Sequence, residues 1–128
     1  MNLQLETTFV DSLFFSEEVF EKSDELEFSY TSAFSEESKD SFLIKFHLKL
    51  KVNGSHSLNI KYNSLFRLDF EITEEFKNSP FLNINAPAIA FPYLRAFISN
   101  FLLSSGFEPI ILPSVNFIKL NENKKNHI

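Results

Sequence analysis

The segment from residue 85 to residue 117 constrains the fold most, because it carries almost no polar surface. Residues 85–105 are predicted to form one helix, and Gly106 is predicted to end it as a left-handed cap. Arg95 and Glu108 are the only charged residues in the segment. A helix that is apolar on nearly every side has to be buried on nearly every side. The helix therefore needs two partners, and a single small sheet provides only one.

Four alternating segments precede this helix and supply the first partner. In each of them apolar and polar side chains take turns, as in a strand with one covered face. The predicted strands are residues 3–9, 26–34, 42–52 and 58–72. Asn53 and Gly54 separate the third strand from the fourth and predict a tight hairpin, because both residues tolerate a positive φ. We expect an α+β fold in which a four-stranded antiparallel sheet is covered on one face by the long C-terminal helix and a crossover loop.

The ends of these elements lead to further expectations. Leu3, Leu5 and Phe9 should share the covered face of the first strand. Asn85 is a candidate N-cap of the helix, because its side-chain oxygen can accept a hydrogen bond from an exposed backbone N–H. Pro92 predicts either a kink or the start of the main helix. Polar connections are expected at residues 16–25, 35–40 and 74–81.

The sides of the helix are expected to have different partners. One apolar stripe should face the sheet and consists of Ile89, Tyr93, Phe97 and Phe101. The remaining face should meet another copy of the chain, since symmetric self-association is the usual way to cover such a surface. The candidate residues of this oligomer interface are Phe91, Tyr93, Leu94, Phe97, Ile98, Phe101 and Leu102. We expect a homodimer or a homotetramer, and we expect Arg95 to pair with a carboxylate or to cap backbone carbonyls.

The bulk properties fit one domain. The chain has 128 residues, which divide into a sheet (1–73), a main helix (85–105), a crossover loop (106–117) and a short tail (118–128). The formal charge of −5 argues against binding to nucleic acid, which rests on neutralising phosphates. No signal sequence is recognised, and the apolar run 87–98 is too short to span a bilayer. We therefore expect a cytoplasmic protein without membrane insertion.

Catalytic and metal-binding patterns are not found. His47, His56 and His127 lack the spacing of metal ligands, and the chain has no cysteine. Acid pairs such as Glu74 and Glu75 have no accompanying base or nucleophile. We expect no enzyme activity, no metal and no cofactor.

Two motifs carry a resemblance to a known family. The sequence PAIAFPYLR at residues 87–95 contains an apolar pair before Phe-Pro-Tyr and an arginine after it. The sequence LPSVNF at residues 112–117 contains a Pro-x-aliphatic-Asn-Phe element. In this order, and after four antiparallel strands, the motifs resemble the protein-export chaperone family SecB.

The resemblance implies a fold, an assembly and an activity. It implies a four-stranded sheet crossed by a long helix, and a dimer of dimers in which the helices lie between sheets. It implies ATP-independent holding of unfolded polypeptide clients for protein export, with the motor protein SecA as a candidate partner. Only residues 118–128 remain for the family's second helix, which is therefore short or missing. This shortening keeps a second hypothesis open, a protein of the same fold dedicated to one partner, such as a toxin–antitoxin chaperone. A third hypothesis is an assembly domain without a client.

The resemblance also implies where the clients bind. The candidate client-binding residues lie in the crossover loop and on the second strand: Phe107, Ile110, Ile111, Leu112, Val115, Phe117, Phe28 and Tyr30. The other interpretation of the loop residues is that they pack on the chain's own sheet. Acidic residues near the first strand, Asp11, Glu17 and Glu18, are weak candidates for docking a partner such as SecA. Lys45, Lys49, Lys51 and Lys61 are expected on the wet face of the sheet, where they either keep the surface soluble or contact a partner.

Overall fold

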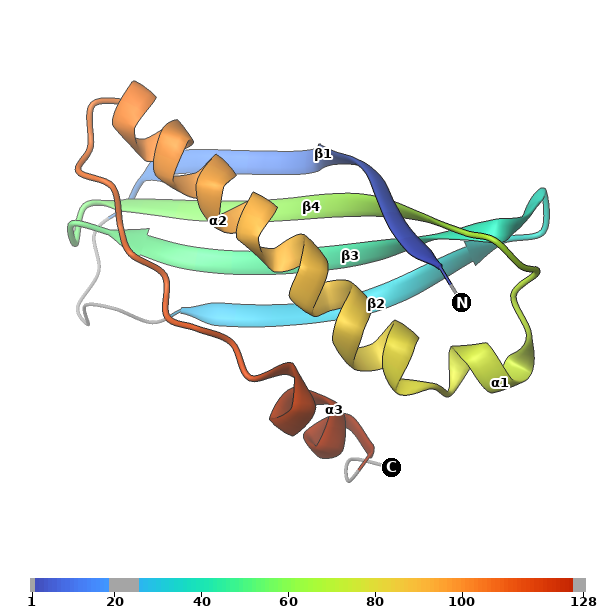
Figure 1. Cartoon of the computed structure of the whole chain (residues 1–128). Coiled ribbons are helices and arrows are strands. Elements are labelled where there is room, and N and C mark those ends of the chain that lie inside the picture. Colours follow the sequence, from blue (N-terminus) through green and yellow to red (C-terminus); the bar gives the residue numbers. More distant parts are fainter. Residues whose placement is uncertain (1, 19–25, 126–128) are drawn as a thin grey trace.

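The computed structural model describes residues 2–18 and 26–125 and confirms the predicted α+β architecture. The strands form one antiparallel sheet in the order β1-β4-β3-β2, and α2 crosses one face of it (Figure 1). The strands are β1 (Leu3–Glu17), β2 (Glu27–Ser35), β3 (Ser38–Val52) and β4 (His56–Leu68). The helices are α1 (Glu74–Lys77), the π-helical turn η1 (Phe81–Asn85), α2 (Ala86–Ser104) and α3 (Phe117–Lys125).

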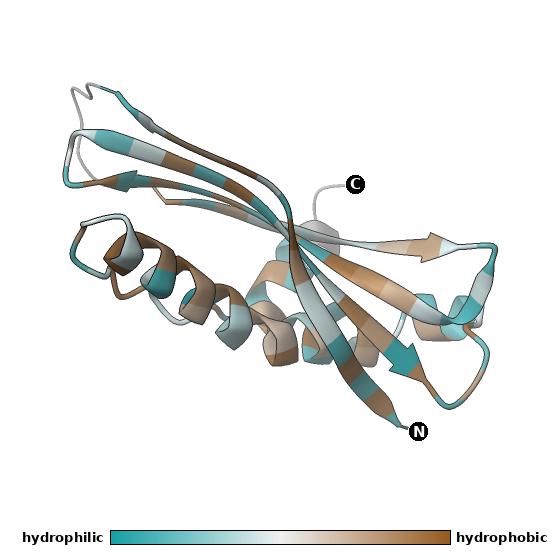
Figure 2. Ribbon diagram, turned by 90° about the horizontal axis from the view of Figure 1, so that it is seen from above, coloured by the Kyte–Doolittle hydropathy of each residue, from teal (hydrophilic) through white to brown (hydrophobic). Residues whose placement is uncertain are grey.

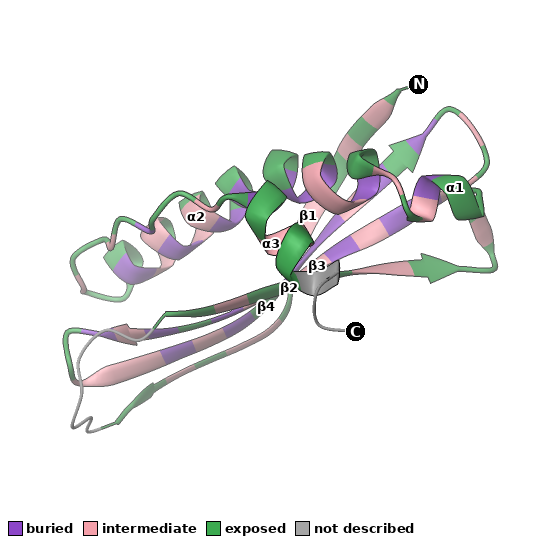
Figure 3. Cartoon of the chain, turned by 90° about the horizontal axis from the view of Figure 1, so that it is seen from below, coloured by how far each residue is buried: buried purple, intermediate pink, exposed green. Residues whose placement is uncertain are grey.

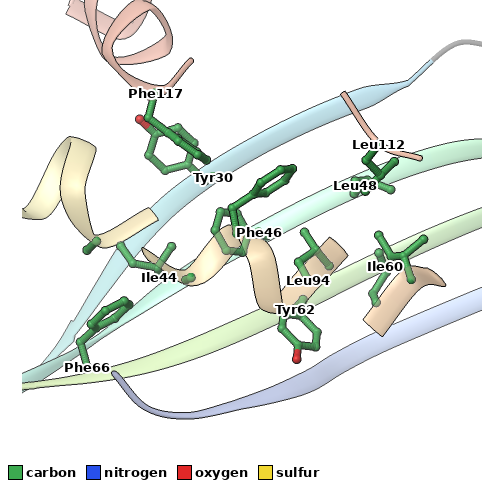
Figure 4. Close-up of a cluster of buried hydrophobic side chains, with 14 of the residues drawn as sticks. Tyr30, Ile44, Phe46, Leu48, Ile60, Tyr62, Phe66, Leu94, Leu112 and Phe117 are labelled. Carbon is green, nitrogen blue, oxygen red and sulfur yellow. The ribbon is translucent and has the colours of Figure 1, made fainter. Parts of the chain in front are cut away.

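The central hairpin of β3 and β4 forms the floor of the core. Its connection uses Asn53 and Gly54 with φ values of 54° and 69°, as the Asn-Gly pair predicts. Most apolar residues of both strands point to the same face and are buried, among them Ile44, Phe46 and Ile60 (Figure 4). Figure 3 shows these buried positions alternating along the strands. Leu43 and Leu65 pair on the opposite face and are partly buried. We call the face that α2 covers the inner face and the opposite one the open face.

The first strand differs from its prediction in length and in the side that Phe9 occupies. It runs to Glu17, so only Ser16 and Glu17 of the expected acidic connection are strand, and residues 19–25 lie outside the described residues. The pairing of β1 with β4 shifts between Leu5 and Thr7 and again between Val10 and Ser12. A bulge of this kind moves the following side chains to the other face. Phe9 therefore pairs with Asn63 on the open face, and the expectation that it shares the face of Leu3 and Leu5 is wrong.

The inner side of α2 is a ladder of residues spaced by four. Ala86, Ala90, Leu94, Ile98 and Leu102 are all fully buried. The expectation that Ile89 and Tyr93 face the sheet is wrong, because both are exposed. Phe97 and Phe101 pack at the side of the helix toward β1 and β4, against Tyr62 and Phe15 respectively.

The N-terminal end of α2 is continuous with η1, which removes the need for a cap. Asn85 has helical dihedrals, and its side chain makes no capping hydrogen bond, so the predicted N-cap is wrong. Pro92 lies inside α2, and the helix does not begin there. Proline removes the hydrogen bond to the carbonyl four residues earlier. Here both Pro92 and Ala88 are exposed, so water can reach that carbonyl.

Two connections show how local sequence sets an element's end. Residues 74–81, expected as a loop, contain α1, because the Thr73 hydroxyl accepts a hydrogen bond from the Phe76 N–H at 3.1 Å. Gly106 has a φ of 88° and ends α2 as predicted. The N–H groups of Gly106 and Phe107 donate to the carbonyls of Leu103 and Leu102, at 3.2 and 2.9 Å.

The continuous helical run Phe81–Ser104 has 24 residues and is long and apolar enough to cross a membrane by length and composition. It is longer than the apolar run 87–98 of the sequence analysis because η1 and α2 join. Core helices of soluble proteins meet the same criterion, and α2 lies along a twisted sheet with its inner ladder buried (Figure 2).

Candidate functional site

An aromatic slot lies between β2, β3 and α2. Its walls are Phe28 and Tyr30 of β2, Phe46 of β3 and Phe91 of α2. Phe117, the first residue of α3, fills it and is only 6% exposed. The Phe117 ring centroid lies 5.4 Å from that of Tyr30 and 5.7 Å from that of Phe91, with steep interplanar angles of 80° and 71°. Edge-to-face packing of this kind is the favoured geometry for aromatic pairs.

The polar group of the slot is already engaged. The Tyr30 hydroxyl donates a hydrogen bond to the backbone carbonyl of Asn83 in η1 at 2.9 Å, which ties β2 to the turn before α2. Burial raises the pKa of Tyr30, because the apolar surroundings disfavour the phenolate. The slot therefore offers an apolar surface and suits an apolar side chain.

The crossover loop after α2 divides into buried and exposed positions. Leu112 is buried on the sheet beside Leu48 (Figure 4), whereas Ile111 is 89% exposed. Ile110 and Val115 are partly buried against the core. The two sequence interpretations of this loop, a client wall and packing on the chain's own sheet, thus apply to different residues. Ile111 is the loop side chain most available to another molecule.

A shallow apolar hollow of about 400 Å³ lies beside the slot. It is lined by residues of η1, α2, the crossover loop and α3: Ile84, Ala88, Ser114, Val115, Asn116, Phe117 and Ile118. No ionisable side chain lines it. The Asn116 side chain accepts a hydrogen bond from the Lys119 N–H at 3.1 Å and so caps α3. The hollow and the slot share Phe117, so they form one continuous apolar region, which we call the groove.

Phe107 lies apart from the groove. Its ring contacts Phe15 at 5.2 Å and His56 at 4.8 Å between ring centroids, at the far end of β1 and β4. Phe15 also meets Phe101 at 5.2 Å, so these rings anchor the end of α2 to the sheet. Phe107 is therefore a packing residue of the protomer, and its predicted role in client binding is not supported by its position.

The residues of the candidate oligomer interface fall into a buried group and an exposed or partly exposed group. Phe91, Leu94, Ile98 and Leu102 are buried within the one chain and belong to its core. The outward side of α2 instead exposes Tyr93 (52%) and Leu103 (62%) together with Ile89. Phe97 and Phe101 are partly buried between the two sides. Arg95 lies with its guanidinium carbon 6.0 Å from the Phe91 ring centroid, a position different from the predicted carboxylate pair or carbonyl cap.

The candidate docking acids do not form a single cluster. Asp11 lies at the second shift of β1 and lines a hollow on the open face with Lys45 and Lys61. Glu17 pairs with His56 at the far end of the strand, and the Glu18 N–H donates to the Ser55 carbonyl at 2.8 Å. Within the described residues, no group of three or more His, Asp or Glu side chains is placed to hold a metal ion.

Sequence reasoning missed several residues of the groove. The sequence predictions put Phe91 in the oligomer interface and do not assign Phe46, Ile84, Ala88 or Ile118 to any site. The alternation of β3 and the helical spacing of α2 place Phe46 and Phe91 on buried faces, which is correct. No local signal shows that these faces also contact Phe117, because the contact joins residues far apart in the sequence.

Several known proteins are similar in sequence to this chain. A family profile described as "Preprotein translocase subunit SecB" matches residues 3–127. The chain belongs to the SecB family. Curated SecB-family relatives include a protein-export protein SecB of Roseobacter denitrificans, 31% identical over 85 residues that cover 63% of this chain and 50% of that protein. Another is the protein-export protein SecB of Nitrosomonas europaea, 46% identical over 46 residues, or 36% of this chain and 29% of that protein. The matched part of this chain thus spans half or less of the length of these relatives.

Solved structures share the SecB fold. A SecB-like chaperone of Mycobacterium tuberculosis, in complex with a ChAD peptide from an antitoxin, superposes with a TM-score of 0.67 at 14% identity and covers 88% of this chain and 89% of that one. A protein of unknown function from Streptococcus agalactiae gives a TM-score of 0.56 at 14% identity and covers 89% of this chain and 98% of that one. At this identity the likeness concerns the fold alone.

Proposed function

We propose that the chain is an ATP-independent holdase that binds non-native polypeptides in the groove. The observation that carries the proposal is the exposure of Ile118 at the hollow of the groove and of Ile111 in the crossover loop, in a chain of the SecB family. Apolar burial contributes roughly 25 cal/mol per Å² and needs no directional partner, so such a surface accepts many sequences. Delivery of clients to the Sec pathway in the cytoplasm, with SecA as a partner, is the further part of this proposal.

The experiment is suppression of aggregation. A reduced, unfolding model client is mixed with the purified chain without ATP, and light scattering is followed over time. The wild-type chain should suppress scattering, and Ile111→Ser should weaken the suppression about tenfold in the concentration required, since roughly 1.5–3 kcal/mol of apolar burial is lost. Ile111 is almost fully exposed, so the substitution leaves the fold intact.

Phe14→Ser is the matched control. Phe14 is also a large exposed apolar residue, but it lies on the open face, on the other side of the sheet from the groove. The Phe14→Ser variant should suppress aggregation as well as the wild-type chain does. Equal loss in both variants, or no suppression by the wild-type chain, would count against a client site in the groove.

A dedicated binding protein is the second candidate function. Its support is the fold likeness to a SecB-like chaperone in complex with a ChAD peptide from an antitoxin. Affinity capture from cells of the source organism discriminates between the two. One stoichiometric partner would favour the dedicated protein, and many unrelated unfolded chains would favour the general holdase.

A further inference from the structure

Two phenylalanines lie on the face of the sheet that α2 does not cover. Phe9 pairs with Asn63 and Phe14 pairs with Asn59, and both asparagines lie on the open face. Phe14 is 69% exposed and Phe9 is 43% exposed. The first shift in β1 puts Phe9 on this face, because without it Phe9 would lie on the inner face with Leu3 and Leu5, and the second shift returns Phe14 to the same face. Large apolar side chains exposed together mark interaction surfaces.

Lysines lie one and two strands away from these rings. Lys61 of β4 is the neighbour of Ser12, between the two phenylalanines along β1. Lys45 of β3 lies beyond Asn63, in the same cross-strand row as Phe9. Neighbouring strands are about 4.8 Å apart, so a segment lying along β1 can reach both lysines. In the cross-strand row of Phe14, Lys49 of β3 lies two strands away, as Lys45 does in the row of Phe9.

The centre of this face is concave. A hollow of about 310 Å³ is lined on this face by Asp11, Lys45, His47, Lys61 and Asn63, among others. His47, which lines the hollow, forms a hydrogen bond with Asn59, and 2.8 Å separates His47 Nε2 from Asn59 Oδ1. The Asn63 side chain is 4% exposed, so the floor of the hollow is closed.

The charges of this face favour an acidic partner. Asp11 and Glu27 oppose the lysines, and Glu27 lies 3.9 Å from Lys49. Within the described residues Lys45 and Lys61 form no ion pair, so their charges face solvent together with His47. A nucleic acid fits less well than a polypeptide, because the chain carries a net charge of −5 and the nearby carboxylates repel a dense row of phosphates.

We propose that the open face binds an acidic polypeptide segment that also carries apolar side chains. The segment lies along β1, its apolar residues cover Phe9 and Phe14, and its carboxylates pair with Lys45 and Lys61. This surface is on the opposite side of the sheet from the groove. It can therefore be occupied together with a client, and the inference does not depend on holdase activity.

The test uses a short fluorescein-labelled peptide in which glutamates alternate with phenylalanines, and fluorescence anisotropy as the readout. The wild-type chain should bind it, and Phe14→Ser and Lys61→Glu should each weaken binding about tenfold or more. Added salt should weaken binding through screening. Phe9→Ser is a second apolar variant, and circular dichroism verifies that all variants fold. Ser105→Ala, at an exposed position outside the open face and the groove, should bind like the wild type.

Several outcomes would overturn the inference. In the first, a matched peptide with lysines in place of glutamates binds the wild-type chain equally well. In the second, Ile111→Ser loses binding of the glutamate peptide but Phe14→Ser does not. In the third, the wild-type chain does not bind the glutamate peptide at all. Tighter binding of a labelled RNA homopolymer than of the glutamate peptide would assign the surface to nucleic acid instead. Because the readout is peptide binding, a failure here is distinguishable from a failure of aggregation suppression.

Discussion

At the scale of single residues, the Ser64 hydroxyl is a buried polar group without a hydrogen-bond partner among the described residues. Ser64 is fully buried on β4, and its oxygen has no hydrogen-bond partner. An unpaired buried hydroxyl costs about 1–3 kcal/mol. Ser64→Ala should therefore leave the free energy of unfolding unchanged or raise it by about 1 kcal/mol, measured by urea unfolding.

Ser41→Ala is the control for this prediction. Ser41 is also buried, but its hydroxyl pairs with that of Ser38. The change should lower the free energy of unfolding by about 0.5–1.5 kcal/mol. A lower stability of Ser64→Ala than of Ser41→Ala would show that Ser64 has a partner in solution.

Tyr30 should make the protein sensitive to high pH. Burial raises its pKa in the folded chain, so the unfolded chain loses the phenolic proton first. Stability is then retained below the unfolded pKa of about 10 and falls as the pH rises above it. Urea unfolding at a series of alkaline pH values should show this fall, and the Tyr30→Phe variant should show a smaller one. Identical slopes in both proteins would contradict the assignment to Tyr30.

At the scale of elements, the end of α2 depends on one backbone angle. Gly106 has a φ of 88°, and a Cβ placed there would meet no atom within 4 Å. Any cost of Gly106→Ala is therefore backbone strain of about 1–2 kcal/mol, with no contribution from steric overlap. Urea unfolding should show this loss, and Ser105→Ala, one residue earlier, should change stability by less. An unchanged midpoint for Gly106→Ala would mean that the helix end adopts another conformation.

The two sides of α2 should respond differently to truncation. Ile98 is fully buried on the inner ladder, so Ile98→Ala should lower the free energy of unfolding by about 2–5 kcal/mol. Tyr93 is exposed on the outer side, so Tyr93→Ser should cost the isolated protomer about 0.5 kcal/mol or less. Urea unfolding at low protein concentration separates the two effects. A large loss in Tyr93→Ser would mean that the outer side is packed within the protomer.

At the scale of the whole molecule, the outer side of α2 is the expected contact between copies. Ile89, Tyr93 and Leu103 are exposed along it, and a helix with two apolar sides requires a cover for each. Light scattering of the wild-type chain at micromolar concentration should give the mass of a dimer or tetramer, and a Tyr93→Ser, Leu103→Ser variant should give a smaller one. A wild-type monomer would contradict this expectation.

Much of the fold follows from local sequence. The alternation in residues 42–52 and 58–72, the Asn53–Gly54 turn and the Gly106 cap each depend on residues close together in the chain. The structure confirms the turn, the cap and the strand alternation as far as Leu68, because strand periodicity and positive φ are properties of a few consecutive residues. Residues 69–72, predicted as strand, lie beyond the end of β4. The motifs around Pro92 and Asn116 likewise identified the family before any contact was known.

The arrangement of the site was decided by tertiary structure. Alternation cannot reveal the bulge that puts Phe9 on the open face, because it depends on the pairing of β1 with β4. A helix that is apolar on nearly every side has no preferred side in its sequence, so only packing in the folded chain selects the buried ladder from Ala86 to Leu102. The contact of Phe117 with Tyr30 joins α3 to β2, which are far apart in the sequence. Sequence therefore determined which elements form and the family they belong to, whereas packing between distant elements determined which of their faces remain open to partners.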